Sequence, residues 1–84
     1  MQEYKLEQPL VTHNISNIYK QLFRLIKKYK QLKLDLSVIK NIDSSGLALL
    51  LELKSMAAKE KCNLSINTDN HIIMRLCQLY KVNL

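Results

Sequence analysis

The chain has 84 residues, of which 48% are hydrophobic and 24% charged, as in an ordinary globular protein. This length predicts one domain spanning residues 1–84. Such a domain buries only about 60% of its unfolded surface, which leaves little stability for strained catalytic machinery. The net charge is +6, and much of it lies in one stretch of the chain: Lys20, Arg24, Lys27, Lys28, Lys30 and Lys33.

The cysteines and the hydropathy pattern bear on the compartment. Cys62 and Cys77 each lie within an apolar pattern and lack the CxxC spacing of a metal site. We expect both to be reduced, buried thiols, as is usual in the cytoplasm. No signal-like segment opens the chain, and the longest apolar run, residues 47–51, is far shorter than the ~20 residues that span a bilayer.

The first part of the chain predicts two short strands and a helix. Residues 4–7 alternate with period two, and Pro9 limits residues 10–12 to a short edge strand. Asn14 is a favourable N-cap for a helix. Apolar residues then recur at helical spacing on one face, opposite a basic face: Ile15, Ile18, Tyr19, Leu22, Phe23, Ile26 and Tyr29.

The second part predicts two strands that alternate with two helices. Residues 32–38 and 63–67 alternate in polarity and read as strands, with a turn near residues 40–41. A helix is predicted over residues 44–59. Thr68 or Asp69 can cap a third helix, whose apolar positions are Ile72, Ile73, Leu76, Cys77 and Tyr80.

This order of elements predicts an α/β fold. Helices between strands favour parallel pairing through right-handed crossovers. Because the strands alternate in polarity, one face of the sheet is expected to be covered and the other polar. We predict two layers: a mixed sheet of about four strands, with the helices packed on one face.

The helix predicted over residues 44–59 has more apolar surface than core packing requires. Its apolar arc covers about 200°, whereas a surface helix needs about 100°. The surplus is a stripe formed by Leu47, Leu51 and Ala58. Either the third helix or a binding partner must cover this stripe.

The start of the same helix carries several polar residues. Asp43 or Ser44 can cap it by accepting a hydrogen bond from a free backbone N–H. Ser45 is expected on the polar side, and Gly46, the only glycine, allows a close approach to the sheet. A phosphate on Ser44 would suit the helix N-terminus but would add charge beside the apolar stripe.

Two segments, Leu34–Ser37 and Ile42–Leu50, resemble the signature of the STAS domain family. The resemblance implies a STAS-like fold, no enzymatic activity, no cofactor and no metal. It also implies a protein-binding surface that includes Asp43, Ser44, Ser45, Leu47, Ala48 and Leu51.

Within the family, Gly46–Leu53 and Met74–Val82 are similar to the MlaB subunits of the bacterial Mla phospholipid-transport system. This implies docking on the ATPase of an ABC transporter that maintains outer-membrane lipid asymmetry. The domain would then be cytoplasmic and peripheral to the inner membrane. The alternative branch is an anti-anti-sigma factor, whose partner is an anti-sigma serine kinase that phosphorylates the position of Ser44.

Other functions have less support in the sequence. Ser44 lacks a G-x-S-x-G elbow, and His13 and His71 are isolated, so no catalytic or zinc site is predicted. The basic helix would allow nucleic-acid binding, but no aromatic residues are interleaved for base stacking, so none is expected. The basic face of this helix is expected to be exposed to solvent, or to be attracted to an acidic partner or an anionic membrane. An exposed apolar helix would also allow two copies to pair when no partner is bound.

Overall fold

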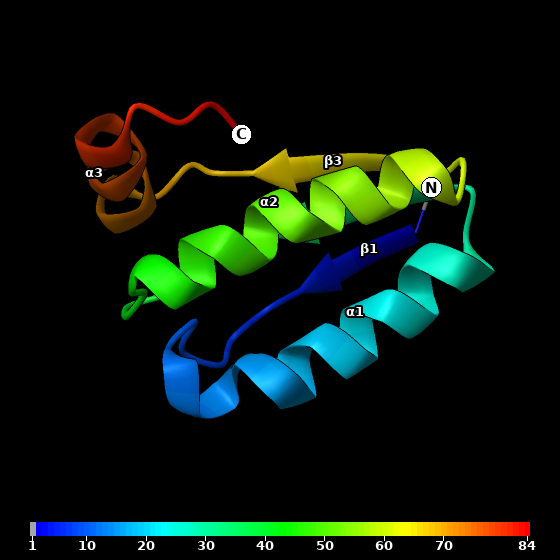
Figure 1. Cartoon of the computed structure of the whole chain (residues 1–84), viewed down its shortest axis with the longest axis horizontal. Helices are drawn as coiled ribbons and strands as arrows, with labels where there is room; N and C mark the ends of the chain where they lie inside the picture. Colours follow the sequence, from blue (N-terminus) through cyan, green and yellow to red (C-terminus); the bar gives the residue numbers. More distant parts are fainter. Residues whose placement is uncertain (1) are drawn as a thin grey trace.

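The computed structural model describes residues 2–84 and has three strands and three α-helices (Figure 1). Each strand is followed by a helix, whereas the sequence predicted a second short strand before the first helix. The elements in chain order are β1 (Gln2–Lys5), the 3₁₀ turn η1 (Thr12–Asn14), α1 (Ile15–Lys28), β2 (Gln31–Asp35), α2 (Ser44–Lys59), β3 (Asn63–Asn67) and α3 (His71–Tyr80).

The three strands form a parallel sheet in the order β1-β2-β3. In its register, Leu32 lies opposite Gln2 on one side and Leu64 on the other. The α/β prediction is therefore confirmed, although the sheet of residues 2–84 is parallel throughout rather than mixed. The expected strand at residues 10–12 is only an isolated bridge between Leu10 and Ile42, because Pro9 lacks an N–H and η1 begins directly afterwards.

The strand boundaries also differ from the sequence prediction. β1 lies two residues earlier than expected, and β2 ends at Asp35 rather than continuing to residue 38. The reason for the early end is local: Asp35 Oδ1 accepts a hydrogen bond of 2.9 Å from the backbone N–H of Ser37. A side chain that bonds two residues ahead turns the chain out of the extended conformation.

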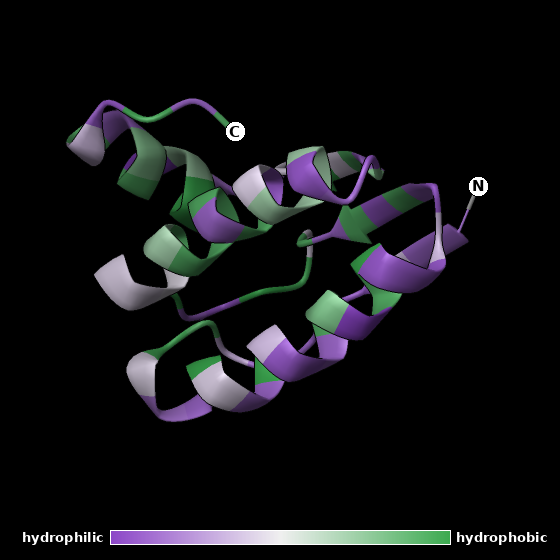
Figure 2. Ribbon diagram, turned by 45° about the vertical axis from the view of Figure 1, so that its right-hand side comes forward, coloured by the Kyte–Doolittle hydropathy of each residue, from purple (hydrophilic) through white to green (hydrophobic). Residues whose placement is uncertain are grey.

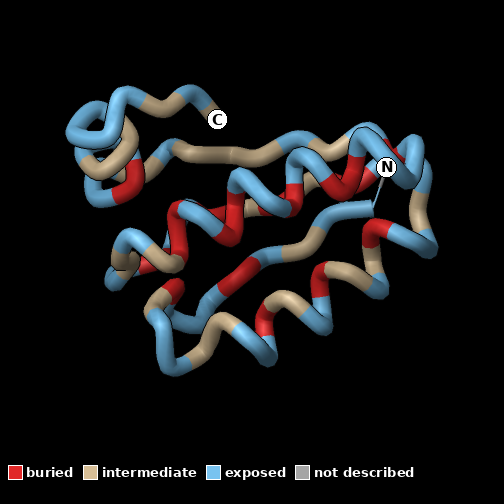
Figure 3. Tube along the Cα trace, in the orientation of Figure 1, coloured by how far each residue is buried: buried red, intermediate tan, exposed pale blue. Residues whose placement is uncertain are grey.

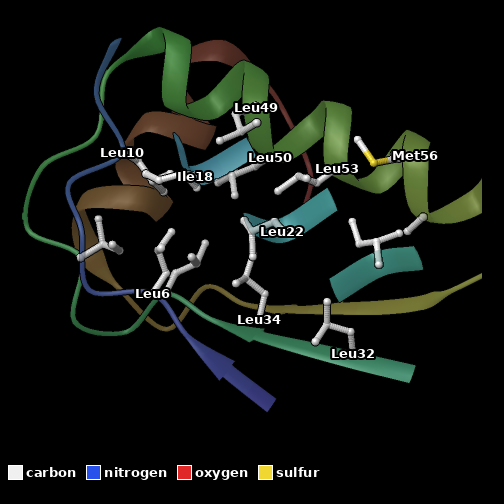
Figure 4. Packing of buried hydrophobic residues seen from close by; sticks show 14 of the residues in the cluster. Leu6, Leu10, Ile18, Leu22, Leu32, Leu34, Leu49, Leu50, Leu53 and Met56 are labelled. Carbon is white, nitrogen blue, oxygen red and sulfur yellow. The ribbon is translucent and has the colours of Figure 1, made fainter. Parts of the chain in front are cut away.

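The helices α1 and α2 cover one face of the sheet, and the other face is polar. Leu32 and Leu34 of β2 are buried, whereas the alternate residues Lys33 and Asp35 are only partly covered. Figure 4 shows the leucines of β2 pointing toward α1 and α2. The two-layer arrangement predicted from the alternating strands is thus confirmed.

The core lies between these two helices and the sheet. α1 contributes Ile18, Leu22 and Ile26, which are at most 1% exposed. α2 contributes Leu50 and Leu53, both fully buried, and Figure 3 shows the buried positions of both helices on the sides that face each other and the sheet.

Helix α3 lies at the margin of this core (Figure 1). Ile73 is its only buried residue. The cap is Asn70 rather than Thr68 or Asp69, because Asn70 Oδ1 accepts hydrogen bonds from the N–H groups of Ile72 and Ile73. Its Nδ2 donates to the carbonyls of Ile39 at 2.7 Å and Leu36 at 2.9 Å, which ties α3 to the loop after β2.

Candidate docking site at the start of helix α2

The start of α2 is organised by Asp43. Its Oδ1 accepts a hydrogen bond of 3.0 Å from the N–H of Gly46, so Asp43 is the N-cap and Ser44 is the first helical residue. Its Oδ2 accepts from the backbone N–H of Thr12 at 3.0 Å and from the Thr12 hydroxyl at 3.1 Å. The Thr12 N–H, followed by the Gly46 N–H, keeps the pKa of Asp43 below its ordinary value. The carboxylate therefore has a structural role.

Ser45 belongs to the same hydrogen-bond network. It is half-buried, and its Oγ lies 3.0 Å from Thr12 Oγ1. The carboxylate of Asp43 can only accept, so the single hydroxyl proton of Thr12 satisfies it, and Ser45 can then donate to Thr12. The expectation that Ser45 lies on the solvated polar side of α2 is wrong, because Ser45 faces η1.

Gly46 lies where α2 crosses the segment before η1. A Cβ at this position would lie 2.1 Å from the carbonyl oxygen of Leu10 and 2.9 Å from Cγ1 of Ile42. That carbonyl also accepts a hydrogen bond of 3.1 Å from the N–H of Asp43, so it cannot move away freely. Gly46 is thus a point of close approach, but its neighbour is the segment at Leu10 rather than the predicted sheet, and only glycine fits there.

The outward side of the helix start is a shallow apolar surface. Ser44 and Ala48 are exposed, and Leu51 is 39% exposed one turn later. Together with two residues from the end of the chain they surround a hollow of about 260 Å³. We call this surface the docking face; it consists of Ser44, Leu47, Ala48, Leu51, Tyr80 and Val82.

Leu47 differs from the rest of the docking face. It is only 4% exposed, so of the two alternatives for the stripe, cover from within the chain applies to Leu47, whereas Leu51 stays exposed. The residues after α3 run back along α2, where Lys54 Nζ donates to the Leu84 carbonyl at 3.1 Å. Leu47 is therefore the floor of the hollow, and a charge there is expected to destabilise the fold.

Comparison with known families now identifies the fold. The family model of the STAS domain matches residues 3–83. The chain belongs to the STAS domain family. A search of curated proteins gives no match. STAS domains are generally non-enzymatic and include anti-anti-sigma factors and MlaB-like proteins.

The metal-ligating and thiol side chains of this STAS domain were compared with the docking face as alternative sites. This part of the chain holds no group of three His, Cys, Asp or Glu residues placed to bind a metal. Cys62 is buried and Cys77 half-buried, both thiols are free, and burial raises the pKa of each, which makes them poor nucleophiles. None of the helices in residues 2–84 combines the length and apolar character that a membrane crossing requires.

Two parts of the site were not found from the sequence. Thr12 was placed in a strand, yet it provides both donors to Oδ2 of Asp43 from 31 positions away. Tyr80 was identified only as an apolar position of the third helix, and the structure shows that it is 52% exposed and lines the docking face. No local pattern indicates either contact, because both depend on how distant segments pack.

Proposed function

We propose that this STAS domain is a non-enzymatic docking subunit that binds a protein through its docking face. The observation that carries the proposal is the exposure of Leu51 and Tyr80, at 39% and 52%, on either side of a hollow beside Ser44. Large apolar side chains that surround a shallow hollow on a small domain are typical of a protein-binding surface. The fixed capping network beneath holds this surface in shape without a partner.

We infer that the partner is the cytoplasmic ATPase of an ABC transporter for phospholipid, whose assembly and activity the domain supports. The two MlaB-like segments, residues 46–53 and 74–82, are distant in sequence, yet both contribute to the docking face. If the chain binds the same kind of partner as the MlaB branch, the segments that resemble this branch should lie together on one surface, as these two do. The domain would lie in the cytoplasm and reach the inner membrane through its complex.

One observation favours the alternative, an anti-anti-sigma factor switched by phosphorylation. Ser44 is exposed, and the side-chain hydrogen bonds at this helix start are made by Thr12, Asp43 and Ser45 instead. The hydroxyl of Ser44 is therefore accessible to a serine kinase. A phosphate there would add charge to the docking face and expel an apolar partner.

Identification of the partner separates the two candidates. The tagged domain is purified from its native cells, and the bound proteins are identified. Recovery of an ABC-type ATPase supports the transporter function. Recovery of a serine kinase, together with phosphate incorporation that Ser44→Ala abolishes, supports the sigma-regulatory function and contradicts the first.

A second experiment tests the docking face itself. Leu51→Glu is expected to weaken binding of the recovered partner at least about tenfold, because it puts a charge into an apolar contact. Ile72→Glu puts the same charge on an apolar side chain of similar exposure, 44%, that does not line the hollow, and is the matched control. Equal binding by the two variants would show that the docking face is elsewhere.

A further inference from the structure

The positive charge of the chain is concentrated in one region. Between Glu7 and Asp35 there are six Lys and Arg residues and no acidic residue. The chain has 13 basic and 7 acidic residues, so the remaining 13 − 6 = 7 basic residues balance the acids. The net charge of +6 therefore originates in α1 and the segment after it.

The fold adds further lysines to this region. α1 and α2 finish at the same end of the molecule, on the right in Figure 1, where β2 and β3 begin. The N–H of Asn63 donates to the carbonyl of Lys30 at 2.7 Å, which holds the two helix-to-strand turns side by side. We call this surface the basic end; it consists of five exposed lysines, Lys27, Lys28, Lys30, Lys59 and Lys61.

Few acidic groups offset these charges. Glu60 is the only acid within the segments 27–30 and 59–62. Glu3 of the neighbouring strand lies opposite Lys33 in the sheet register, so the negative charge of Glu3 is offset by Lys33 rather than by the lysines of the basic end. Figure 2 shows the outer side of α1 and this end as hydrophilic.

The docking face occupies the first half of α2, residues 44–51, and the basic end lies at the other end of this helix. The helix runs from Ser44 to Lys59, and 16 residues at 1.5 Å each span about 22 Å between the first and last positions. Asp35 and Asp43 lie at the far end, where β2 finishes and α2 begins. The molecule is thus charged asymmetrically along its helices.

The type of cation indicates the type of ligand. All five residues of the basic end are lysines, whose point charges on flexible stems suit a diffuse negative surface, whereas arginine suits bidentate reading of individual groups. Stacking of nucleic-acid bases requires exposed aromatic faces. Here the ring of Tyr29 is half-buried and lies 5.4 Å below the ammonium group of Lys28. An anionic lipid surface fits this arrangement better than a nucleic acid.

We propose that the basic end binds the surface of an anionic phospholipid bilayer by electrostatic attraction, and that this contact turns the docking face away from the membrane. Lysines near an anionic surface each add to the attraction, which decays within a Debye length. The apolar side of α1 is occupied by the core, so the contact is peripheral. This inference goes beyond the proposed function and does not depend on the identity of the protein partner.

The test uses the isolated chain and lipid vesicles, without any ATPase, so its result is independent of the proposed function. Vesicles of phosphatidylcholine alone are compared with vesicles containing about one third phosphatidylglycerol, and bound protein is measured by sedimentation. We expect binding only to the anionic vesicles, falling as salt is added. Equal binding to both kinds of vesicle, or tighter binding to random duplex DNA at the same salt, would overturn the proposal.

Two triple variants locate the contact. Lys28→Gln, Lys30→Gln and Lys61→Gln together are expected to lower the affinity for anionic vesicles about 100-fold. The matched control, Lys40→Gln, Arg75→Gln and Lys81→Gln, also removes three charges, and each set includes one lysine with a positive φ angle. The control is expected to lose no more than a few-fold in affinity. The same loss in both sets would mean that net charge alone acts, and the assignment to the basic end would be wrong.

Discussion

Helices α1 and α3 are both amphipathic in sequence, but the fold uses them differently. In α1 the apolar face is enclosed, with Ile18, Leu22 and Ile26 at most 1% exposed. In α3 only Ile73 is enclosed, whereas Ile72 is 44% and Leu79 is 72% exposed. Periodicity therefore identifies which residues share a face, but it does not show what covers that face.

The difference follows from the place of each helix in the topology. α1 connects β1 to β2 and lies against the sheet between them, so its apolar face meets the core. α3 follows the last strand of the sheet and is held mainly by Ile73 and the amide of Asn70. We therefore expect α1 to be part of the cooperative core and α3 to open at a lower free energy.

The largest expected effect compares a leucine from each helix. Leu22→Ala removes a side chain that is 1% exposed and is expected to lower the free energy of unfolding by about 2–5 kcal/mol. Leu79→Ala removes one that is 72% exposed and should change it by less than about 0.5 kcal/mol. Urea unfolding of both variants measures the difference, and similar losses would contradict the contrast between the helices.

The anchor of α3 gives an intermediate effect. Asn70→Ala removes the cap of α3 and three hydrogen bonds to the loop after β2, so a loss of about 1–2 kcal/mol is expected. Amide hydrogen exchange should become faster in α3 and remain slow in α1. Asn17→Ala, at an exposed position of α1, is the control and should leave both helices unchanged. Faster exchange in α1 than in α3 would show that Asn70 supports the whole fold.

The smallest effect concerns acid. Asp43 joins α2 to Thr12, which precedes α1, and hydrogen bonds from the Thr12 and Gly46 N–H groups lower its pKa. The pKa of Asp35 is lowered chiefly by the N–H of Ser37. A lowered pKa in the folded state gives stability that is complete above the ordinary carboxyl pKa of about 4 and is lost as the pH falls below it.

The side chain that holds α3 is the amide of Asn70, which does not titrate, whereas the carboxylate of Asp43 holds the segment before α1. Acid should therefore weaken the α1 side of the domain first. The melting temperature is expected to fall with pH below about 4, and more gradually in Asp43→Asn. Ser44→Ala leaves the Asp43 network intact and should keep the full dependence. The same acid dependence in Asp43→Asn as in the unmodified chain would remove Asp43 from this explanation.

The sequence predicts those elements whose signals are local. α2 has the predicted bounds, residues 44–59, because a capping residue precedes one unbroken apolar pattern. β3 also has its predicted bounds, residues 63–67. The glycine at 46 was recognised as a point of close approach because it is the only one in the chain.

Features that depend on distant contacts were not predictable. The cap of α3 is Asn70 rather than its neighbours, because only its amide also reaches the carbonyls of Leu36 and Ile39. For Leu47 the sequence left open whether the third helix or a partner covers it, and residues more than 30 positions away in the chain do so. Local patterns contain no information on either contact.

The ends of α2 and α3 share a backbone feature with a consequence for surface charge. Lys61 and Lys81 have φ angles of 58° and 55°, in the left-handed region where glycine is usual after a helix. A lysine there costs about 1 kcal/mol relative to glycine. At residue 61 the more stable choice would remove a charge from the basic end. The φ angle of Lys61 therefore couples folding stability to membrane attraction. A change to glycine at residue 61 would raise the first and lower the second, so evolution or engineering toward either property alters the other.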